Sequence, residues 1–150
     1  MNIRLLFIAV FLISLVTLSV HADDYCKGYH SPSNPFQCFK HGNCVWWAAY
    51  KRPDLKAHMH GNAREWYRDA INVGFPVGRV PVKGSIVVFN GLKDDKGKRY
   101  GHVAYVESVN EDGSFNVSQM DYYGKFGDGV STGRFSMQAT YTVPHTVGQS

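Results

Sequence analysis

Cys44 is the residue of this sequence best suited to nucleophilic chemistry. The chain contains three cysteines, Cys26, Cys38 and Cys44. If Cys26 and Cys38 pair, their disulfide closes a short loop with little regular structure and ties it down. Cys44 is then left as a free thiol, which an odd cysteine count marks as a candidate reactive group. The plain alternative is that Cys44 is a small buried hydrophobic residue.

The residues around Cys44 favour the reactive interpretation. The run VWWAAYKR predicts a helix over residues 45–52 that is stopped by Pro53, with Asn43 as its N-cap after Gly42. Cys44 then occupies the first helical position. Unpaired backbone N–H groups and the positive end of the helix dipole stabilise a thiolate at that position, and the thiolate is the nucleophilic form.

A hairpin later in the chain carries the second group that can do chemistry. Strands are predicted over residues 101–109 and 114–123, joined by a turn at residues 110–113 with the sequence NEDG. A four-residue turn places Val109 opposite Ser114. Side chains alternate between the two faces of a strand, so this register decides which residues meet at the far end of the hairpin.

Three polar side chains converge at that end of the hairpin. In the predicted register His102 faces Asp121, and Ala104 faces Gln119. Such a group can simply satisfy its own hydrogen bonds. It can also hold an imidazole in one tautomer, ready to serve a nucleophile. The second possibility makes His102 the candidate partner of the cysteine thiol.

Two further elements position these groups. The run GNAREWYRDA places Asn62 and Glu65 in a capping-box arrangement and predicts a helix from residue 63 to about residue 73, ending at the next glycine. The run SIVVF predicts a strand at residues 85–89 that is buried on both faces, and the charged residues 92–99 predict an exposed loop. The face of the helix predicted to be core carries Trp66, Ala70 and Val73.

Length and composition limit the class of protein. The chain has 150 residues, 44% hydrophobic and 19% charged, which suffices for one domain with a real core. A formal net charge of +4 favours anionic partners only weakly and falls short of a nucleic-acid-binding face. His41, His58 and His60 with Cys44 lack a recognised metal-site spacing, and no phosphate-binding or dinucleotide glycine pattern occurs. We therefore expect no metal, no cofactor and no nucleic-acid partner.

The first 22 residues have the pattern of a secretory signal peptide. A basic start precedes the almost wholly apolar run at residues 5–20, and a plausible cleavage site follows at Ala22. An uncleaved membrane anchor is the alternative, but the run is short for a full span. We expect cleavage near Ala22 and a secreted or periplasmic mature chain in an oxidising compartment.

Five ordered stretches cover roughly residues 38–145: GNCVWWAAYKRP, GNAREWYRDA, PVKGSIVVF, GHVAYVESVNEDGSFNVSQMDY and YTVPH. Together they resemble the cysteine, histidine-dependent amidohydrolase/peptidase family, the CHAP domain. The resemblance implies an α+β, papain-like fold in which N-terminal helices pack on an antiparallel β-sheet. Residues 23–150 then form a single CHAP-like domain, whose N-terminal extension, residues 23–40, is tied by the Cys26–Cys38 disulfide.

The resemblance also implies roles for single residues. By position, Cys44 resembles the nucleophile and His102 the general base. The family usually has a glutamate and then an asparagine near the histidine, whereas this sequence has Gln119 and Asp121. We favour Asp121 as the residue that orients His102, because a carboxylate accepts from an imidazole N–H, and keep Gln119 as the second candidate. Asn43 either caps the helix alone or also helps to hold an oxyanion.

The activity implied by the resemblance is cleavage of an amide bond in peptidoglycan through an acyl-enzyme. The bond lies either between muramic acid and alanine, as for an N-acetylmuramoyl-L-alanine amidase, or within the peptide, as for an endopeptidase. Peptidoglycan is the expected partner, with an inhibitor protein as a safeguard and a monomer as the expected state. At least one of two adjacent helical tryptophans is expected in the core. The candidates for flanking the substrate groove are Trp46, Trp47, Tyr122 and Tyr123.

Two other interpretations stay open at this point. A wall-binding or interaction module would keep the CHAP-like fold and lose turnover. Gln119 and Asp121, which depart from the family pattern, favour this interpretation, whereas Cys44 and His102 oppose it. A secreted toxin would use the hydrolytic chemistry against the wall of a competitor. The sequence leaves the scissile bond and the wall chemotype undecided.

Overall fold

The structure is a computed structural model that describes residues 34–38, 42–94, 96–122, 129–136 and 145–147. Cys26 and the expected signal peptide lie outside the described residues. Within them the chain forms two short α-helices, one 3-10 turn and one sheet of six strands. In chain order these are α1 (Cys44–Lys51), η2 (Ala63–Glu65), α2 (Trp66–Val73), β1 (Val77–Gly78), β2 (Ile86–Phe89), β3 (His102–Val109), β4 (Phe115–Met120), β5 (Val130–Phe135) and β6 (His145–Val147).

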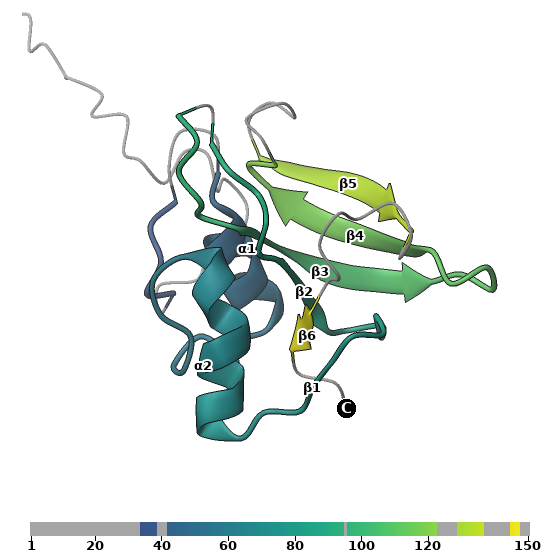
Figure 1. The fold of residues 1–150 in the computed structure, drawn as a ribbon, viewed down its shortest axis with the longest axis horizontal. Helices are drawn as coiled ribbons and strands as arrows, with labels where there is room; N and C mark the ends of the chain where they lie inside the picture. Colours follow the sequence, from purple (N-terminus) through teal and green to yellow (C-terminus); the bar gives the residue numbers. More distant parts are fainter. Residues whose placement is uncertain (1–33, 39–41, 95, 123–128, 137–144, 148–150) are drawn as a thin grey trace, which may run out of the picture.

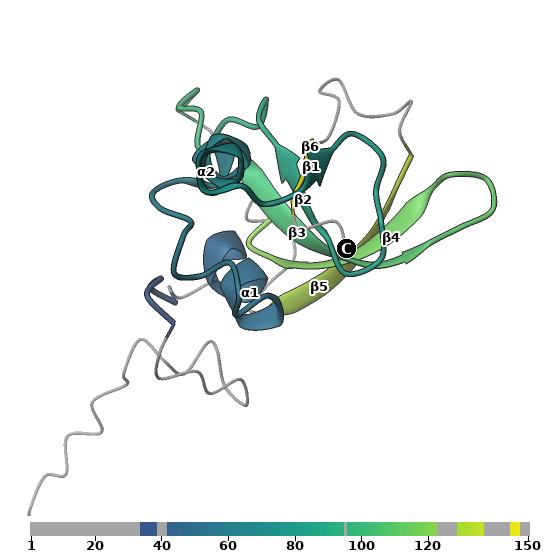
Figure 2. The same cartoon turned by 90° about the horizontal axis from the view of Figure 1, so that it is seen from below.

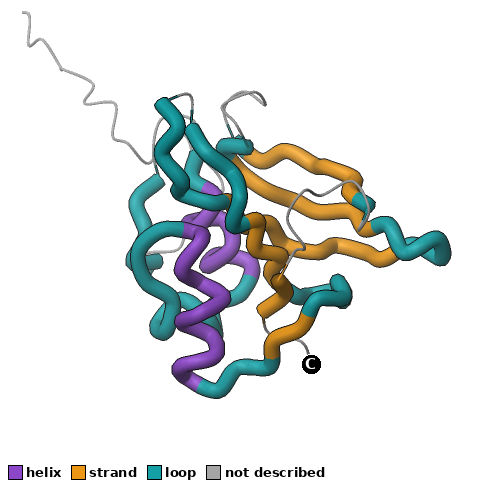
Figure 3. The backbone as a smooth tube through the Cα atoms, in the orientation of Figure 1, coloured by secondary structure: helices purple, strands orange, loops and turns teal. Residues whose placement is uncertain are grey.

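The two helices lie on the same side of the sheet. The strand order is β1-β6-β2-β3-β4-β5, and every neighbouring pair is antiparallel. Figures 1 and 2 show α1 and α2 on one side of the central strands, and Figure 3 separates the helical layer from the strand layer. This arrangement confirms the α+β class and the antiparallel sheet that the sequence predicts. The sequence pattern did not predict β1, β5 and β6.

Two apolar clusters fill the two faces of the central strands, and β2 is buried on both of them, as its continuous apolar run predicts. The cluster on the helix side comprises Val45, Ala48, Ala49, Leu55, Met59, Ala63, Trp66, Ala70, Ile86, Val88 and Val103. The cluster on the other face comprises Val87, Phe89, Ala104, Val106, Phe115 and Val117. No helix among the described residues is long and apolar enough to cross a bilayer.

Helix α1 is short but largely buried. Ala48 and Ala49 are 0% and 1% exposed, and their small side chains let the helix backbone approach the sheet closely. The helix ends before Arg52, close to the predicted boundary. The Arg52 guanidinium donates to the Gly84 carbonyl oxygen at 2.7 Å, which ties the end of the helix to the turn before β2.

The second helical segment begins as a 3-10 turn and continues as α2. The Glu65 carboxylate accepts from the Asn62 backbone N–H at 3.1 Å, which is the reciprocal half of the predicted capping box. Trp66 and Ala70 are fully buried, as predicted. The prediction is wrong for Val73, which is 48% exposed.

The exposure of Val73 follows from the way in which α2 ends. Gly74 adopts a left-handed φ of 80°, and the following N–H, that of Phe75, returns to the Ala70 carbonyl at 2.9 Å. This turn brings Phe75 onto the helix-side cluster, where its ring meets His58 edge-on. Phe75 therefore covers the end of the core, and Val73 is left facing outward.

The β3–β4 hairpin departs from the predicted register near its turn and agrees with it nearer the site. Val109 pairs with Phe115 rather than with the residue before it, so the turn is one residue longer than predicted. A β-bulge at Glu107 then removes the extra offset. Beyond the bulge Tyr105 pairs with Ser118, which is the predicted pairing.

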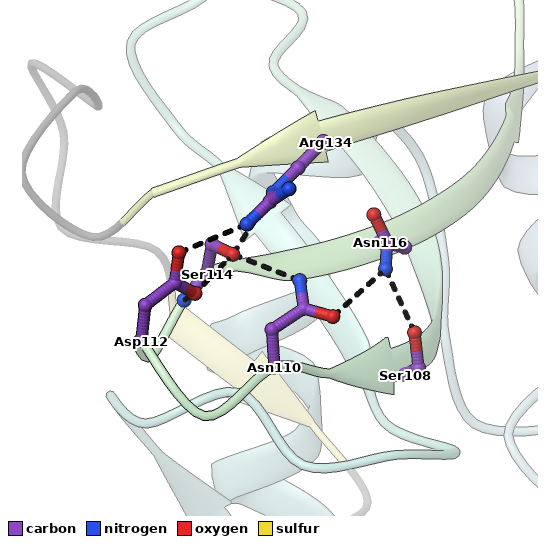
Figure 4. A network of polar contacts seen from close by, with 6 residues as sticks. All are labelled: Ser108, Asn110, Asp112, Ser114, Asn116 and Arg134. Atoms are coloured by element: carbon purple, nitrogen blue, oxygen red, sulfur yellow. Dashed lines mark hydrogen bonds and ion pairs between the residues drawn. The ribbon is translucent and has the colours of Figure 1, made fainter.

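A polar network closes the turn of this hairpin and fastens it to β5 (Figure 4). Ser114 is buried and accepts hydrogen bonds from Asn110 Nδ2 at 2.8 Å and from Arg134 Nε at 3.0 Å. Its own hydroxyl donates to Asp112, and Asp112 forms an ion pair with Arg134 at 2.9 Å. The bonds within the turn hold its longer loop in one conformation.

Gly101 fixes the start of β3, one residue before His102. Its φ is 74°, and a Cβ atom added there would lie 2.7 Å from the backbone nitrogen of Arg64. The Arg64 N–H donates to the Tyr100 carbonyl at 3.0 Å, so the two backbones are already in contact. Glycine is required here both for its left-handed conformation and for the close approach to η2.

We expect Gly101→Ala to lower the free energy of unfolding by about 2–5 kcal/mol, because left-handed strain and a steric clash add together. Gly113→Ala is the matched control, since Gly113 has a φ of 76° but nothing within 4 Å of an added Cβ. Its loss is expected to be the strain alone, about 1–2 kcal/mol. Urea unfolding of the three proteins measures both losses, and equal losses would rule out the close approach as a cause.

Candidate active site

Asn43 sets the orientation of the first turn of α1. Its Oδ1 accepts from the Val45 backbone N–H at 3.0 Å, which confirms the predicted N-cap. Its Nδ2 donates to the Gln37 carbonyl at 2.9 Å, so the same side chain holds the N-terminal segment against the helix. The amide donor is thus already engaged. Of the two roles considered for Asn43, the structure favours capping, which leaves the Cys44 backbone N–H as the candidate oxyanion donor.

Cys44 is the first residue of α1, and its side chain is half-buried and free of any disulfide. Burial raises the pKa of its thiol to about 11, and the Asp121 carboxylate adds to the rise. Backbone N–H groups of Val103, Val45 and Cys44 itself oppose this effect but do not overcome it. The N–H groups at the helix start thus act in the expected direction, but in the free protein desolvation outweighs them.

His102 is the first residue of β3, and its side chain is only 3% exposed. Its Nε2 lies 2.9 Å from Gln119 Oε1. The rings of Phe89 and Tyr122 pack against the imidazole at centroid distances of 6.1 Å and 4.9 Å. Burial lowers the pKa of His102 to about 4, although the hydrogen bond to Gln119 acts in the opposite direction. The imidazole is therefore neutral at neutral pH.

Gln119, rather than our preferred Asp121, is the residue whose hydrogen bond to the His102 ring the structure records. Strand β4 ends at Met120, and Asp121 leaves the extended conformation with a φ of 51°. Gln119 lies within the strand, diagonally across from His102 on the same face, at a separation that a long side chain can span. Asp121 is exposed and lines the groove described below.

The hydrogen bond to Gln119 decides which nitrogen of His102 can act as a base. The amide oxygen accepts, so Nε2 carries the proton and Nδ1 keeps a free lone pair. The amide nitrogen of Gln119 is buried without a hydrogen-bond partner among the described residues. It lies on the strand opposite Ser131, whose buried hydroxyl is likewise unpaired there. An amide at this position accepts from His102 but brings no negative charge to it.

Cys44 and His102 line the same groove, which has a volume of about 1340 Å³. This volume exceeds the range of about 300–1,000 Å³ that is usual for small-molecule pockets. No hydrogen bond between described residues joins the Cys44 thiol directly to the His102 ring, so the free site holds a neutral thiol beside a neutral imidazole. The lining comes from residues 35–37, 43–45, 56–57, 59–63, 92–94 and 100–102, and from Asp121.

The structure does not support the tryptophans as groove residues. Trp46 and Trp47 are 6% and 4% exposed and pack with Met120 in a third apolar cluster, so both belong to the core. A two-turn helix covered on this side has no exposed position for either ring. Tyr122 packs edge-on against His102 and is not among the lining residues. Tyr123 lies outside the described residues.

Sequence reasoning missed the side chains that border the groove. Tyr100 is 38% exposed and lies two residues before His102. Lys56 and Lys93 come from the turn after α1 and from the loop after β2. The sequence offers no signal for them, because Lys56 and Lys93 look like ordinary solvated residues. Among the described residues no three potential metal ligands are grouped around a common point.

We expect the free energy of unfolding to rise between pH 4 and pH 6.5 because of His102. The unfolded chain protonates this histidine below its ordinary pKa of 6.5, whereas the folded protein resists protonation down to a pKa of about 4. Stability is therefore fully present above pH 6.5 and is lost by up to about 3 kcal/mol as the pH falls to 4. Urea unfolding of the wild type and of His102→Gln across this range measures the effect. Parallel curves for the two proteins would contradict it.

The comparison with protein families gives one match over most of the described chain. The CHAP domain profile matches residues 34–121. This range contains Cys44, His102, Gln119 and Asp121. The matched range extends from the N-terminal segment at residue 34 to Asp121, just after β4.

Two staphylococcal proteins are similar in sequence. The chain is 36% identical over 108 residues to the staphylococcal secretory antigen ssaA2 of Staphylococcus aureus and 37% identical over 107 residues to the secretory antigen SsaA of Staphylococcus epidermidis. The alignments cover 72% and 69% of this chain but only 36% and 38% of those proteins. The chain thus spans little more than a third of the length of these curated relatives.

Solved structures share the fold. An N-acetylmuramoyl-L-alanine amidase from Staphylococcus aureus superposes with a TM-score of 0.60 at 24% identity, over 85% of this chain and 37% of that one. Ly7917 with the hydrolysing product of MDP gives a TM-score of 0.52 at 22% identity, over 71% of this chain and 53% of that one. These likenesses confirm the α+β, papain-like fold that the motifs imply. The profile match over residues 34–121 shows that this chain belongs to the CHAP family.

Proposed function

We propose that this protein hydrolyses an amide bond of peptidoglycan, with Cys44 as nucleophile and His102 as general base. The observation that carries the proposal is that Cys44 and His102 line one groove. Gln119 orients the imidazole through the hydrogen bond between its Oε1 and His102 Nε2. The likeness to the fold of an N-acetylmuramoyl-L-alanine amidase and membership of the CHAP family support the choice of substrate.

The reaction begins from a neutral pair. His102 Nδ1 takes the thiol proton of Cys44 as the sulfur attacks the carbonyl carbon of the scissile amide. Substrate in the groove completes the geometry, since the thiol and the imidazole are not hydrogen-bonded in the free protein. The developing oxyanion accepts a hydrogen bond from the Cys44 backbone N–H at the start of α1. This N–H has no acceptor within the helix.

The second half of the reaction returns the site to its starting state. The protonated His102 gives its Nδ1 proton to the leaving amine, and the carbonyl carbon stays attached to the Cys44 sulfur as a thioester. Water then loses a proton to His102 and attacks the thioester. The C–S bond of the thioester then breaks as the acid product forms, and His102 gives its proton to the departing Cys44 sulfur. Gln119 keeps the imidazole in one tautomer throughout, because its oxygen continues to accept from Nε2.

The size and borders of the groove favour a polymer over a small molecule. Its volume of about 1340 Å³ accommodates several sugar or amino-acid units. Tyr100 offers an exposed aromatic ring on which a sugar or peptide can pack. Lys56 and Lys93 attract the carboxylates of wall peptides, while Asp94 and Asp121 keep the net charge of the groove low. The site leaves amidase and endopeptidase activity as alternatives.

The second candidate function is a wall-binding module with little or no turnover. The high pKa of Cys44, the low pKa of His102 and the neutral Gln119 favour it, because each opposes an ion pair between thiolate and imidazolium. The same groove would then bind peptidoglycan without cleaving it. The intact Cys44 and His102 in one groove favour the enzyme.

We expect the wild-type protein to release soluble fragments from purified peptidoglycan, and Cys44→Ala to lower the rate by about 10⁴-fold or more, because the nucleophile is lost. Mass spectrometry of the fragments identifies the bond: free peptides indicate the amidase, and shortened peptides indicate the endopeptidase. Gly113→Ala is a control for handling and folding. If the folded wild type binds walls of several chemotypes but leaves them uncleaved, the hydrolase proposal is wrong and the wall-binding module is the function.

We further propose that residues 1–22 direct export and that Cys26 pairs with Cys38 in the exported chain. The names of the secretory relatives support export. Cys38 is buried at 7% exposure beside Trp46 and Trp47, which gives the bridge a fixed anchor next to α1. The only free cysteine among the described residues is Cys44.

Non-reducing peptide mapping is expected to find Cys26 linked to Cys38 and Cys44 alkylated without prior reduction. Replacing Cys26 and Cys38 together by serine is expected to lower the free energy of unfolding by about 3 kcal/mol, because the unfolded chain regains the entropy of the short loop. A bridge that includes Cys44 would overturn both the pairing and the proposed nucleophile.

A further inference from the structure

A chain of polar contacts joins α1 to the β3–β4 hairpin. Trp47 Nε1 donates to Ser118 Oγ at 2.9 Å, and this hydroxyl donates to Glu107 Oε1 at 2.6 Å. Lys51 Nζ donates to the same carboxylate oxygen at 2.8 Å. We call these four residues the helix–hairpin bridge. It connects α1 with the two strands of a hairpin that lies far from α1 in the sequence.

The bridge uses the stripe of α1 that begins with the nucleophile. Cys44, Trp47 and Lys51 are spaced three and four residues apart, so they follow one face of the helix. Cys44 is the first residue of α1 and Lys51 the last. Over eight residues the helix rises about 10 Å, so the contact of Lys51 restrains the end of a short rod whose other end carries the thiol.

On the hairpin, the bridge ends beside the residue that holds His102. Ser118 directly precedes Gln119 in β4, and neighbouring side chains of a strand point to opposite faces. Ser118 accordingly meets α1 on one face, while Gln119 meets His102 on the other. A shift of α1 along β4 would therefore move the nucleophile relative to its base.

The bridge is more than a surface ion pair. Trp47 and Ser118 are each 4% exposed, and the Ser118 hydroxyl both accepts and donates. The Lys51 ammonium also lies 4.2 Å from the centroid of the Tyr105 ring. Partial burial alone would raise the pKa of Glu107, but the hydrogen bonds from Lys51 and Ser118 outweigh it and hold the pKa below its usual range.

The β-bulge gives Glu107 this position. The ladder of β3 and β4 pairs Val106 with Val117 and then Ser108 with Asn116. Glu107 therefore has no paired residue on β4. A bulged residue is free to turn its side chain away from the regular alternation. The carboxylate of Glu107 can thus reach both α1 and β4 at once.

We propose that Glu107 is a positioning residue for Cys44. By accepting hydrogen bonds from Lys51 of α1 and from Ser118 of β4, its carboxylate locks α1 against the hairpin, so that the thiol stays in reach of His102. This inference rests on the proposed function and adds to it a residue that touches neither substrate nor reacting atoms. A displacement of about 1 Å at reacting groups lowers a rate by about a hundredfold, which sets the scale of the effect.

Steady-state kinetics on soluble peptidoglycan fragments tests the proposal. Glu107→Ala is expected to lower kcat by about tenfold to a hundredfold and to leave KM within about twofold, because the groove itself is untouched. Glu107→Gln is expected to keep more of kcat than Glu107→Ala, since an amide oxygen still accepts from Ser118 and Lys51. Asp112→Ala is the matched control: it removes the acid of an ion pair at the other end of the same hairpin (Figure 4). Its kcat should equal that of the wild type.

The rate at which iodoacetamide alkylates Cys44 in the folded protein is the second readout, and it needs no substrate. Glu107→Ala is expected to speed alkylation, because an α1 that is no longer held against the hairpin exposes the desolvated thiol to water and so favours its thiolate form. Asp112→Ala is expected to leave the rate unchanged. If the wild type alkylates normally but cleaves no peptidoglycan, the proposed function fails and the alkylation rates still decide the role of Glu107. If Glu107→Ala matches the wild type both in kcat and in the rate of Cys44 alkylation, the positioning role is wrong. If that variant does not fold, Glu107→Gln and Trp47→Phe decide it by the same two measurements.

Discussion

The burial of α1 against the β3–β4 hairpin is the constraint on which the rest of the site depends. A helix of eight residues has almost no stability of its own in water, so α1 exists because its alanine-rich face is covered by the sheet. The same packing that makes the helix possible also fixes where its first residue lies. The position of Cys44 is therefore set by tertiary packing. The start of β3, where His102 lies, is positioned by the close contact of Gly101 with η2.

Burial has a second consequence, because it decides the charge of the two groups that are brought together. The His102 ring is buried and the Cys44 thiol is partly desolvated, so both groups are neutral at physiological pH. A carboxylate next to the imidazole would favour the charged pair, but Gln119 supplies orientation without charge. In the proposed reaction the pair therefore starts neutral and becomes charged only as the thiol proton moves to His102.

The sequence was informative wherever local chemistry decides the structure. The Asn43 cap, the extent of α1 and the doubly buried β2 follow from residue types over a few positions, and the structure confirms them. The motifs implied the fold class, which depends on the order of elements. Pattern reasoning also brought His102 and Gln119 to one face of the hairpin, because alternation along strands survives small errors in the turn.

The structure differs from the expectations where distant parts of the chain decide the outcome. The choice of Asp121 over Gln119 assumed that β4 continues, whereas the chain turns into a left-handed conformation at Asp121. The tryptophans of α1 are core because strands that the sequence did not reveal, such as β5, complete the sheet beside them. The low thiol pKa expected at a helix start ignored desolvation, which depends on everything that packs around Cys44. None of these effects has a local signature.

The bulge at Glu107 divides the hairpin into two halves that are aligned independently. The half next to the turn pairs with one offset, and the half next to the site pairs with another, so an additional residue in the turn is absorbed before the strand reaches Tyr105. The tip also projects away from the helices (Figure 1). A change in the length of the turn would accordingly alter the pairing between the turn and the bulge, while the pairing from Tyr105 onward would keep its alignment.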